Sequence, residues 1–272
     1  MRARAAAALL ASALPLAVAT PARAGPPPLE HDTRRDGAIT AGAAVLWLSG
    51  ELAKGKLAPS SCRWCAENRL DAGTRDLLVW GYGDHAARAS DALAFGIIPA
   101  GLAAHQLLAA RAAGDTREGW VDLLIVAQAA AIGMDLNQLV KLSVGRQRPF
   151  VHHGNWREAN REPEADDNLS FYSGHASFTF ALAAAAGTVS DLRGYRSSPW
   201  IWGAGMTLAA ATAYLRIAAD KHYLTDVLTG AALGTAAGIA LPRLMHPRKE
   251  PSGSGGATAT VTPVPLGIVV VF

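Results

Sequence analysis

The feature that most constrains the fold is a series of apolar, alanine-rich segments separated by short polar loops. Strand signals are scarce, so the segments favour helices. The chain is 50% hydrophobic and only 17% charged, which excludes a disordered protein. We therefore predict an all-α fold, a helical bundle of about six core helices. The segments lie at 38–50, 93–110, 121–140, 176–190, 200–215 and 227–241.

Other stretches of the chain are not expected to form long apolar helices. A long loop is expected at 51–75, an amphipathic helix at 76–90 and an acidic loop at 151–172. Residues 250–272 are expected to form a flexible tail, because 250–262 is rich in Gly, Ser, Thr and Pro. The last residues of that tail are β-prone. The helical domain is therefore expected to occupy 25–249.

Residues 1–24 resemble a secretory signal peptide. Arg2 and Arg4 precede an apolar run, and Ala22-Arg23-Ala24 fits the small-x-small rule for cleavage before Gly25. An uncleaved membrane anchor is the alternative. This segment also holds the excess of positive charge, since the remaining residues contain 22 basic and 22 acidic side chains. A nucleic-acid binder is therefore not expected.

The helices fit either a membrane or the buried core of a soluble bundle. The apolar segments are short for membrane spans, which need about 20 residues. If the last five segments span, however, the basic loops at 111–119, 191–199 and after 241 all lie on one side, as the positive-inside rule requires. Trp120, Trp200 and Trp202 open segments on that same side, as interfacial anchors do. We expect a membrane-embedded bundle.

Two cysteines, Cys62 and Cys65, form a C-x-x-C pair in a polar loop. In an exported protein a disulfide is the leading interpretation. A redox motif is the alternative, but no βαβ pattern surrounds the pair. A zinc site would need two further ligands, and the chain has no second cysteine pair.

Three motifs gather on the side opposite the basic loops. In the first, Lys141 and Arg148 are seven residues apart, so on a continuing helix they share one face, and Pro149 ends that helix. In the second, Ser173 and Gly174 stand where a helix begins, before His175. The hydroxyl of Ser173 can cap the helix, Gly174 permits close approach of a ligand, and the helix start favours an anion.

The third motif runs from Arg216 to Asp226. His222 and Asp226 are four residues apart and are expected to share a helix face, so the carboxylate can fix the tautomer of the imidazole. Arg216 adds a guanidinium suited to phosphate oxygens. Each motif alone is weak, but together they predict an anion site with two groups that transfer protons.

The order and spacing of these residues resemble the type 2 phosphatidic acid phosphatase (PAP2) superfamily, which also contains acid phosphatases and vanadium haloperoxidases. Its pattern is K-x6-R-P, P-S-G-H and S-R-x5-H-x3-D, matched here over 141–226. Tyr172 replaces the usual proline and is expected to alter the rim of the pocket. Leu215 replaces the usual serine.

The resemblance implies a phosphatase. It makes His222 the nucleophile, Asp226 its orienting carboxylate, and His175 the general acid and then the base. It assigns Lys141, Arg148, Arg216, Ser173 and Gly174 to the phosphate. Because three cations can neutralise the phosphoryl charge, no metal and no other cofactor is expected.

The implied substrate is a phosphate monoester or diphosphate, carried on a lipid. The implied place is the bacterial inner membrane, with the site facing the periplasm. The alternatives are a soluble periplasmic acid phosphatase, a vanadate-dependent haloperoxidase, transfer of phosphate between lipids, and a scaffold with a vestigial site. Asp166 and Asp167 are expected at the surface. His152 and His153 either line the entrance of the site or lie in a solvated loop.

Overall fold

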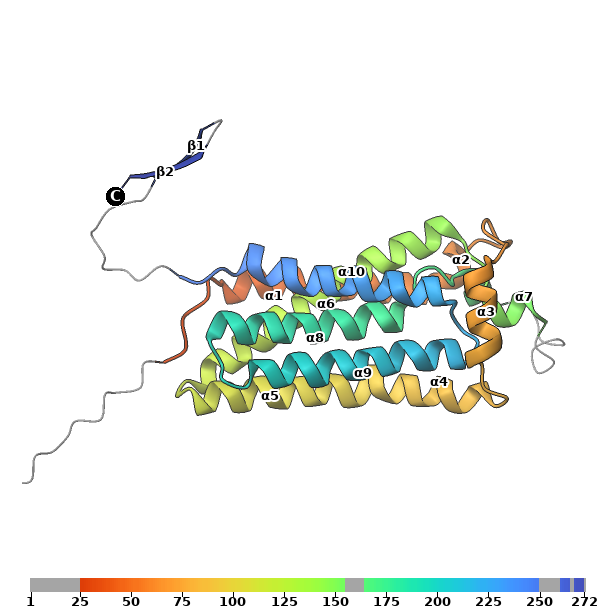
Figure 1. Cartoon of the computed structure of the whole chain (residues 1–272), viewed down its shortest axis with the longest axis horizontal. Coiled ribbons are helices and arrows are strands. Elements are labelled where there is room, and N and C mark those ends of the chain that lie inside the picture. The colour runs from red at the N-terminus through yellow and green to blue at the C-terminus, as the bar shows by residue number, and fades with distance from the viewer. Residues whose placement is uncertain (1–24, 155–163, 250–259, 265–266, 272) are drawn as a thin grey trace, which may run out of the picture.

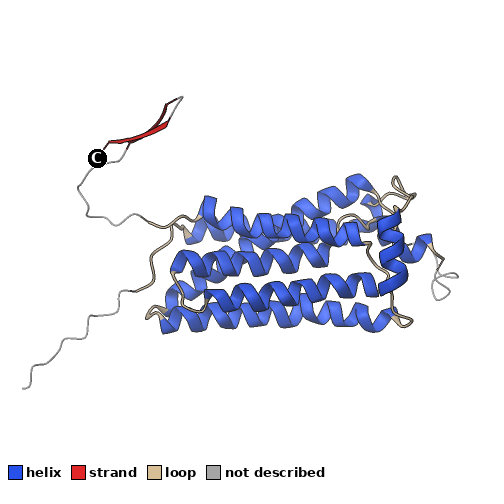
Figure 2. Ribbon diagram, in the orientation of Figure 1, coloured by secondary structure: helices blue, strands red, loops and turns tan. Residues whose placement is uncertain are grey.

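The computed structural model describes residues 25–154, 164–249, 260–264 and 267–271. It confirms the all-α bundle, in which the long helices lie roughly side by side (Figures 1 and 2). One of them, Gly83–Ala112, is continuous and is made of α4, a π-helical turn η1 and α5. All six apolar segments fall within long helices. Their bounds are α1 Thr33–Leu52, α4 Gly83–Ala92, η1 Leu93–Ile97, α5 Ile98–Ala112, α6 Thr116–Val144, α8 Gly174–Arg193, α9 Ser198–Ala218 and α10 Leu224–Met245.

The prediction for 51–90 was wrong in detail. The expected loop contains α2 (Lys54–Leu57) and most of α3 (Arg69–Leu78). The helix expected at 76–90 is divided between α3 and α4, because the chain turns at 79–82. Asn68 caps α3 by accepting a hydrogen bond from Asp71 N, which fixes where this helix begins.

The expected acidic loop also contains two short helices, α7 (Pro149–His152) and the 3-10 turn η2 (Ala165–Asn168). Beyond the bundle, the strands β1 (Thr260–Val264) and β2 (Gly267–Val271) pair antiparallel, as the β-prone composition suggested. Residues 250–259, where the flexible tail begins, and the expected signal peptide at 1–24 lie outside the described residues.

Helix α8 is the centre of the bundle, and most of its residues are buried. Its closest neighbour is α10, which presents a glycine at every fourth residue. A Cβ at Gly230, Gly234 or Gly238 would lie 2.6, 2.3 or 2.5 Å from a backbone carbonyl oxygen of α8 or its N-cap. Only glycine permits this approach, and the contact fixes the starts of both helices beside each other.

Among the residues that the structure describes, three helices are long and apolar enough to cross a membrane: Gly83–Ala112, Thr116–Val144 and Leu224–Met245. In their most apolar stretches only 22%, 44% and 28% of residues are buried within the protein, so much apolar surface faces outward. These are the features of a membrane protein. Of the five segments that the charge argument treated as spans, α8 and α9 are long enough but do not meet the same criterion of composition.

The basic loops and the three motifs lie at opposite ends of the bundle, as expected. At the basic end, Trp120 and Trp200 are 63% and 79% exposed. Arg248 ties the end of the bundle to α8 by donating to the carbonyl of Leu192. At the other end, α3 crosses the ends of the long helices and α7 lies beyond it (Figure 1).

Candidate active site

A cavity of about 130 Å³ opens at the end of the bundle that carries the motifs. It brings together Lys141, Arg148, Gly174, His175, Arg216 and His222 from the three predicted motifs. Helices α1, α2, α6 and α8, the π-helical turn η1 and the 3-10 turn η2 supply the rest of its wall. Those residues are Trp47, Glu51, Lys54, Phe95, Met134, Asn137, Asp166 and Phe178.

The first motif reaches the cavity differently from the prediction. Helix α6 ends at Val144, because Gly145 takes a left-handed conformation with φ of 60° and caps it. Lys141 therefore belongs to the last turn of α6, whereas Arg148 lies in the loop beyond. Pro149 does not end α6 but begins α7. The two cations converge because the chain turns at Gly145, and not because they share a helix face.

The second motif begins α8 as predicted. Ser173 is fully buried and caps the helix by accepting from Ala176 N. A Cβ added to Gly174 would lie 3.1 Å from Asn137 Oδ1 and 3.4 Å from Lys141 Nζ. Gly174 therefore lets the start of α8 approach the lysine closely, and Asn137 holds the loop by donating to the carbonyl of Tyr172 at 2.8 Å.

His222, the predicted nucleophile, lies in the loop before α10 and not on the helix. Its side chain is 1% exposed, and its Nε2 is 3.5 Å from Arg148 Nη1. Burial and the neighbouring cations hold the pKa of His222 well below its usual value. The imidazole is therefore neutral at neutral pH, with a lone pair available for attack.

Asp226 lies in the first turn of α10, and its Oδ2 is 3.6 Å from His222 Nδ1. That is longer than a hydrogen bond, and within the described residues Nδ1 has no other hydrogen-bond partner. The same carboxylate oxygen accepts from Ser170 Oγ at 2.5 Å and from Tyr223 N at 3.0 Å. Asp226 is thus held in place beside the imidazole ring.

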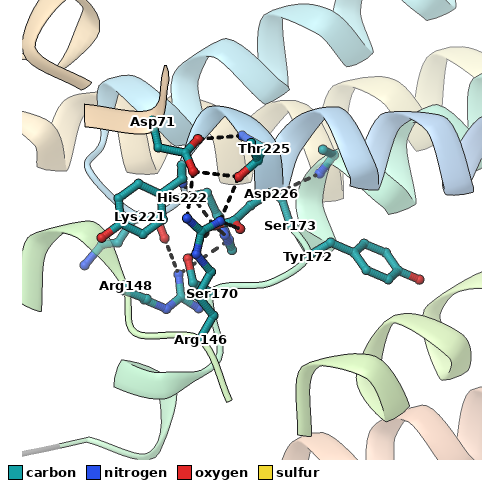
Figure 3. Close-up of polar contacts among 12 residues, drawn as sticks. Asp71, Arg146, Arg148, Ser170, Tyr172, Ser173, Lys221, His222, Thr225 and Asp226 are labelled. Atoms are coloured by element: carbon teal, nitrogen blue, oxygen red, sulfur yellow. Dashed lines mark hydrogen bonds and ion pairs between the residues drawn. The ribbon is translucent and has the colours of Figure 1, made fainter. Parts of the chain in front are cut away.

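Arg146 is a residue that the sequence reasoning missed. It is completely buried and donates to Asp226 Oδ1 at 2.6 Å and to Asp71 Oδ2 at 2.7 Å (Figure 3). Its guanidinium lies 4.1 Å from the ring centres of both Trp64 and Tyr223. Arg146 therefore fixes the carboxylate that lies beside His222. No local signal distinguishes it from other arginines.

Asp166 was expected at the surface; its side chain is 40% exposed, but it also belongs to the cavity, which the sequence did not indicate. Its carboxylate lines the cavity, 2.5 Å from Arg148 Nη2 and 3.2 Å from Lys54 Nζ. Burial by itself would raise the pKa of Asp166, but Arg148 and the lysines around it lower it well below the usual range. Asp167 was also expected at the surface, but it is buried, at 8% exposure, and caps η2. An anionic group thus already lies among the cations.

His175 and Arg216 share a partner that the sequence did not reveal. Asp91 Oδ1 is 2.7 Å from His175 Nε2 and 3.6 Å from Arg216 Nη1. Asp91 lies in the last turn of α4, two residues before the π-helical turn, in which Phe95 packs edge-on against His175 with ring centres 5.0 Å apart. Such turns interrupt helices frequently at functional sites. Burial and the nearby cations, Arg216 first among them, lower the pKa of His175 well below its usual value. The contact with the Asp91 carboxylate opposes this, because an adjacent carboxylate stabilises the protonated imidazole.

Two other predictions concern the surroundings of the cavity. Cys62 and Cys65 form a disulfide in the loop beside α6. Tyr172 does not line the cavity in the described structure. It is 1% exposed and points away from the catalytic cluster (Figure 3), so the expectation that it shapes the rim was wrong.

The arrangement is chemically suited to phosphoryl transfer. Three cations and the start of α8 surround a space that suits a tetrahedral anion, with a buried neutral imidazole on its wall. The model of the PAP2 superfamily matches residues 122–250, which contain all three motifs. Over this region, which is slightly less than half of the chain, the protein is similar to the PAP2 superfamily.

Comparisons with individual proteins are more limited. A lipid A 1-phosphatase of Porphyromonas gingivalis is 35% identical over 89 residues, which are 33% of this chain and 19% of that protein. The chain thus aligns with only about a fifth of that relative's length. A transmembrane PAP2-type phosphatidylglycerolphosphate phosphatase from Bacillus subtilis aligns over 76% of this chain and 93% of its own, with a TM-score of 0.43 and 14% identity.

Proposed function

We propose that this chain is a metal-independent phosphatase that hydrolyses a phosphate monoester or diphosphate carried on a lipid. One observation carries the proposal. His222, buried and neutral, lies in one cavity with His175 and with the three cations that would bind the phosphoryl oxygens. The match of residues 122–250 to the PAP2 superfamily and the similarity to a lipid A 1-phosphatase support it.

The reaction proceeds in two steps. His222 Nε2 attacks phosphorus, the bond to the leaving oxygen breaks, and that oxygen takes a proton from His175. Water then attacks the phosphohistidine and gives its proton to His175, which releases phosphate and restores the imidazole. Lys141, Arg148 and Arg216 stabilise the charge on the transferred group, so the chemistry needs no metal.

A lipid substrate is supported by the membrane character of the bundle. The apolar outer surface of α4–α5, α6 and α10 suits lipid better than water, so a soluble acid phosphatase is not favoured. No feature of the cavity favours the haloperoxidase. We place the protein in the bacterial inner membrane with its site facing the periplasm, because the disulfide lies at the site end and the basic loops lie at the other.

The test is phosphate release in excess EDTA from phosphatidic acid, undecaprenyl diphosphate and p-nitrophenyl phosphate. Wild type should release phosphate, preferentially from a lipid, and His222→Ala should not. The matched control His85→Ala changes an exposed histidine of α4 and should retain activity. Loss of wild-type release in EDTA, or a preference for the soluble ester, would contradict the proposal.

Orientation has its own test. In spheroplasts, a maleimide that cannot cross the membrane should label Cys62 and Cys65 after reduction. It should not label Ala112→Cys in a chain without the native cysteines, because Ala112 is exposed at the basic end. The opposite labelling would place the site on the cytoplasmic side.

A further inference from the structure

Two histidines and a glutamate converge outside the catalytic cavity. His152 and His153 end α7, and Glu67 precedes α3. One ligand atom from each lies within 4.8 Å of the others. His153 Nε2 is 3.0 Å from Glu67 Oε2, and His152 Nε2 is 3.9 Å from Glu67 Oε1. From these contacts we propose that Glu67, His152 and His153 bind a divalent cation of the zinc class.

The distances fit such an ion. In a tetrahedral zinc site with bonds of about 2.0–2.2 Å, neighbouring ligand atoms lie roughly 3.4 Å apart. The separations of 3.0 and 3.9 Å between the glutamate oxygens and the two imidazoles lie on either side of that value. The two separations involve different oxygens of Glu67, and the three ligand atoms lie within 4.8 Å of one another, so side-chain rotations that close this spacing would complete the site. Two imidazole nitrogens and one carboxylate oxygen are ligands that zinc accepts, and water takes the fourth position.

One contact favours a tautomer suited to metal binding. His152 Nδ1 is 3.4 Å from Gln147 Oε1, and an amide oxygen can only accept a hydrogen bond. This contact favours the tautomer with the proton on Nδ1, which leaves Nε2, 3.9 Å from Glu67 Oε1, free to bind the ion. Metal-binding histidines usually donate their other N–H to a carbonyl or carboxylate in this way. Gln147 thus acts as a positioning residue for the ion.

The two segments that supply the ligands are already held together. Arg63 N donates to the carbonyl of Gly145 at 2.9 Å, and Gln147 N donates to that of Trp64 at 3.1 Å. Helix α7 in turn contacts the loop of the nucleophile, because Phe150 N donates to the carbonyl of Asp220 at 3.2 Å. A bound ion would therefore clamp α7 to the disulfide loop and stiffen the segment that follows Arg148. It would take no part in the chemistry in the cavity.

Zinc binding to the purified, tag-free protein tests the proposal, measured by competition with a chromophoric chelator. One equivalent should bind, and an excess of Mg²⁺ should not displace it. Glu67→Gln and His153→Ala should each weaken binding at least tenfold. Gln147→Leu should weaken it by about 10–100-fold, as loss of a partner behind a ligand does. The thermal midpoint of each variant without metal shows whether it is folded.

Two controls locate the ion. His85→Ala changes an exposed histidine elsewhere and should bind zinc as wild type does. His222→Ala should also retain the zinc, which separates this site from the catalytic cavity. Binding that persists in Glu67→Gln and His153→Ala, binding that is lost in His222→Ala, or the absence of bound zinc in wild type would each overturn the proposal.

Discussion

Replacement of Arg146 by methionine tests whether the buried ion network supports the nucleophile. The change keeps much of the side-chain volume but removes the only charge that joins Asp71 Oδ2 to Asp226 Oδ1 in the described structure. All three side chains are 0% exposed. The two carboxylates would then lie buried with no cation between them.

The magnitude follows from what each carboxylate retains. Removing one partner of a buried ion pair costs about 3–5 kcal/mol. Asp71 still accepts from Thr225 N and Oγ, and Asp226 still accepts from Ser170 and Tyr223. We therefore expect the lower end, about 3 kcal/mol. For a chain of this size that lowers the thermal midpoint by about 6–12 °C.

Catalysis should respond separately from stability. Arg146 does not line the cavity, so KM should change little, whereas kcat should fall because Asp226 loses its fixed position beside His222. The assays are thermal unfolding in detergent and steady-state phosphate release at a temperature where the variant is folded. Arg88→Met, an exposed change on α4, is the matched control and should be within about 0.5 kcal/mol of wild type.

A double variant separates charge from shape. Adding Asp71→Asn to Arg146→Met removes one of the two unpaired carboxylates, so it should recover part of the lost stability. A network worth about 3 kcal/mol should lower the thermal midpoint by more than two or three degrees. The reasoning is refuted if Arg146→Met unfolds within two or three degrees of wild type and its kcat is unchanged.

The remaining predictions concern the two histidines and the acidic residues around them. Asp91→Asn should lower kcat about tenfold or more for substrates with poor leaving groups, because it weakens the general acid His175. The effect on p-nitrophenyl phosphate should be smaller. Asp76 is 73% exposed on α3, and Asp76→Asn should leave kcat unchanged. Asp166→Asn should tighten inhibition by inorganic phosphate up to about fivefold, since an ion pair this exposed is worth at most about 1 kcal/mol; unchanged or weaker inhibition would contradict its place in the anion site. Because burial and the nearby cations lower the pKa of His222, it stays neutral as the pH falls through 6.5; the acid limb of kcat/KM, corrected for ionisation of the substrate, should therefore lie below pH 6.5, and a limb above it would contradict this.

The long helices were predictable because they depend on local composition. Each apolar segment has a helical preference of its own, and all six predicted segments lie within helices of the bundle. The helix ends were harder to predict. Pro149 is the more obvious break in the sequence, yet α6 ends earlier because Gly145 adopts a positive φ. Short helices such as α2 and α7 carry too few residues for a periodic signal.

The polar residues of the site were likewise only partly predictable from the sequence. His175 and His222 could be found because each belongs to a motif of fixed spacing. Asp91 could not, because it meets His175 across 84 residues of sequence. Likewise Asp71 meets Arg146 across 75 residues. These contacts exist only once the helices pack, so no pattern in a single sequence indicates them.

The central claim is that His222 carries the phosphoryl group. The most direct test is to react wild type, His175→Ala and His222→Ala briefly with p-nitrophenyl phosphate, quench in alkaline denaturant and map phosphorylated peptides by mass spectrometry. Because this substrate has a good leaving group, the first step does not need the proton from His175 and still proceeds in His175→Ala. The second step still needs a base to activate water, so the phosphohistidine should accumulate in that variant. The account predicts a phosphoryl group on the peptide containing His222, more abundant in His175→Ala than in wild type and absent from His222→Ala. Continued turnover by His222→Ala, or a phosphoryl group on a different residue, would contradict it.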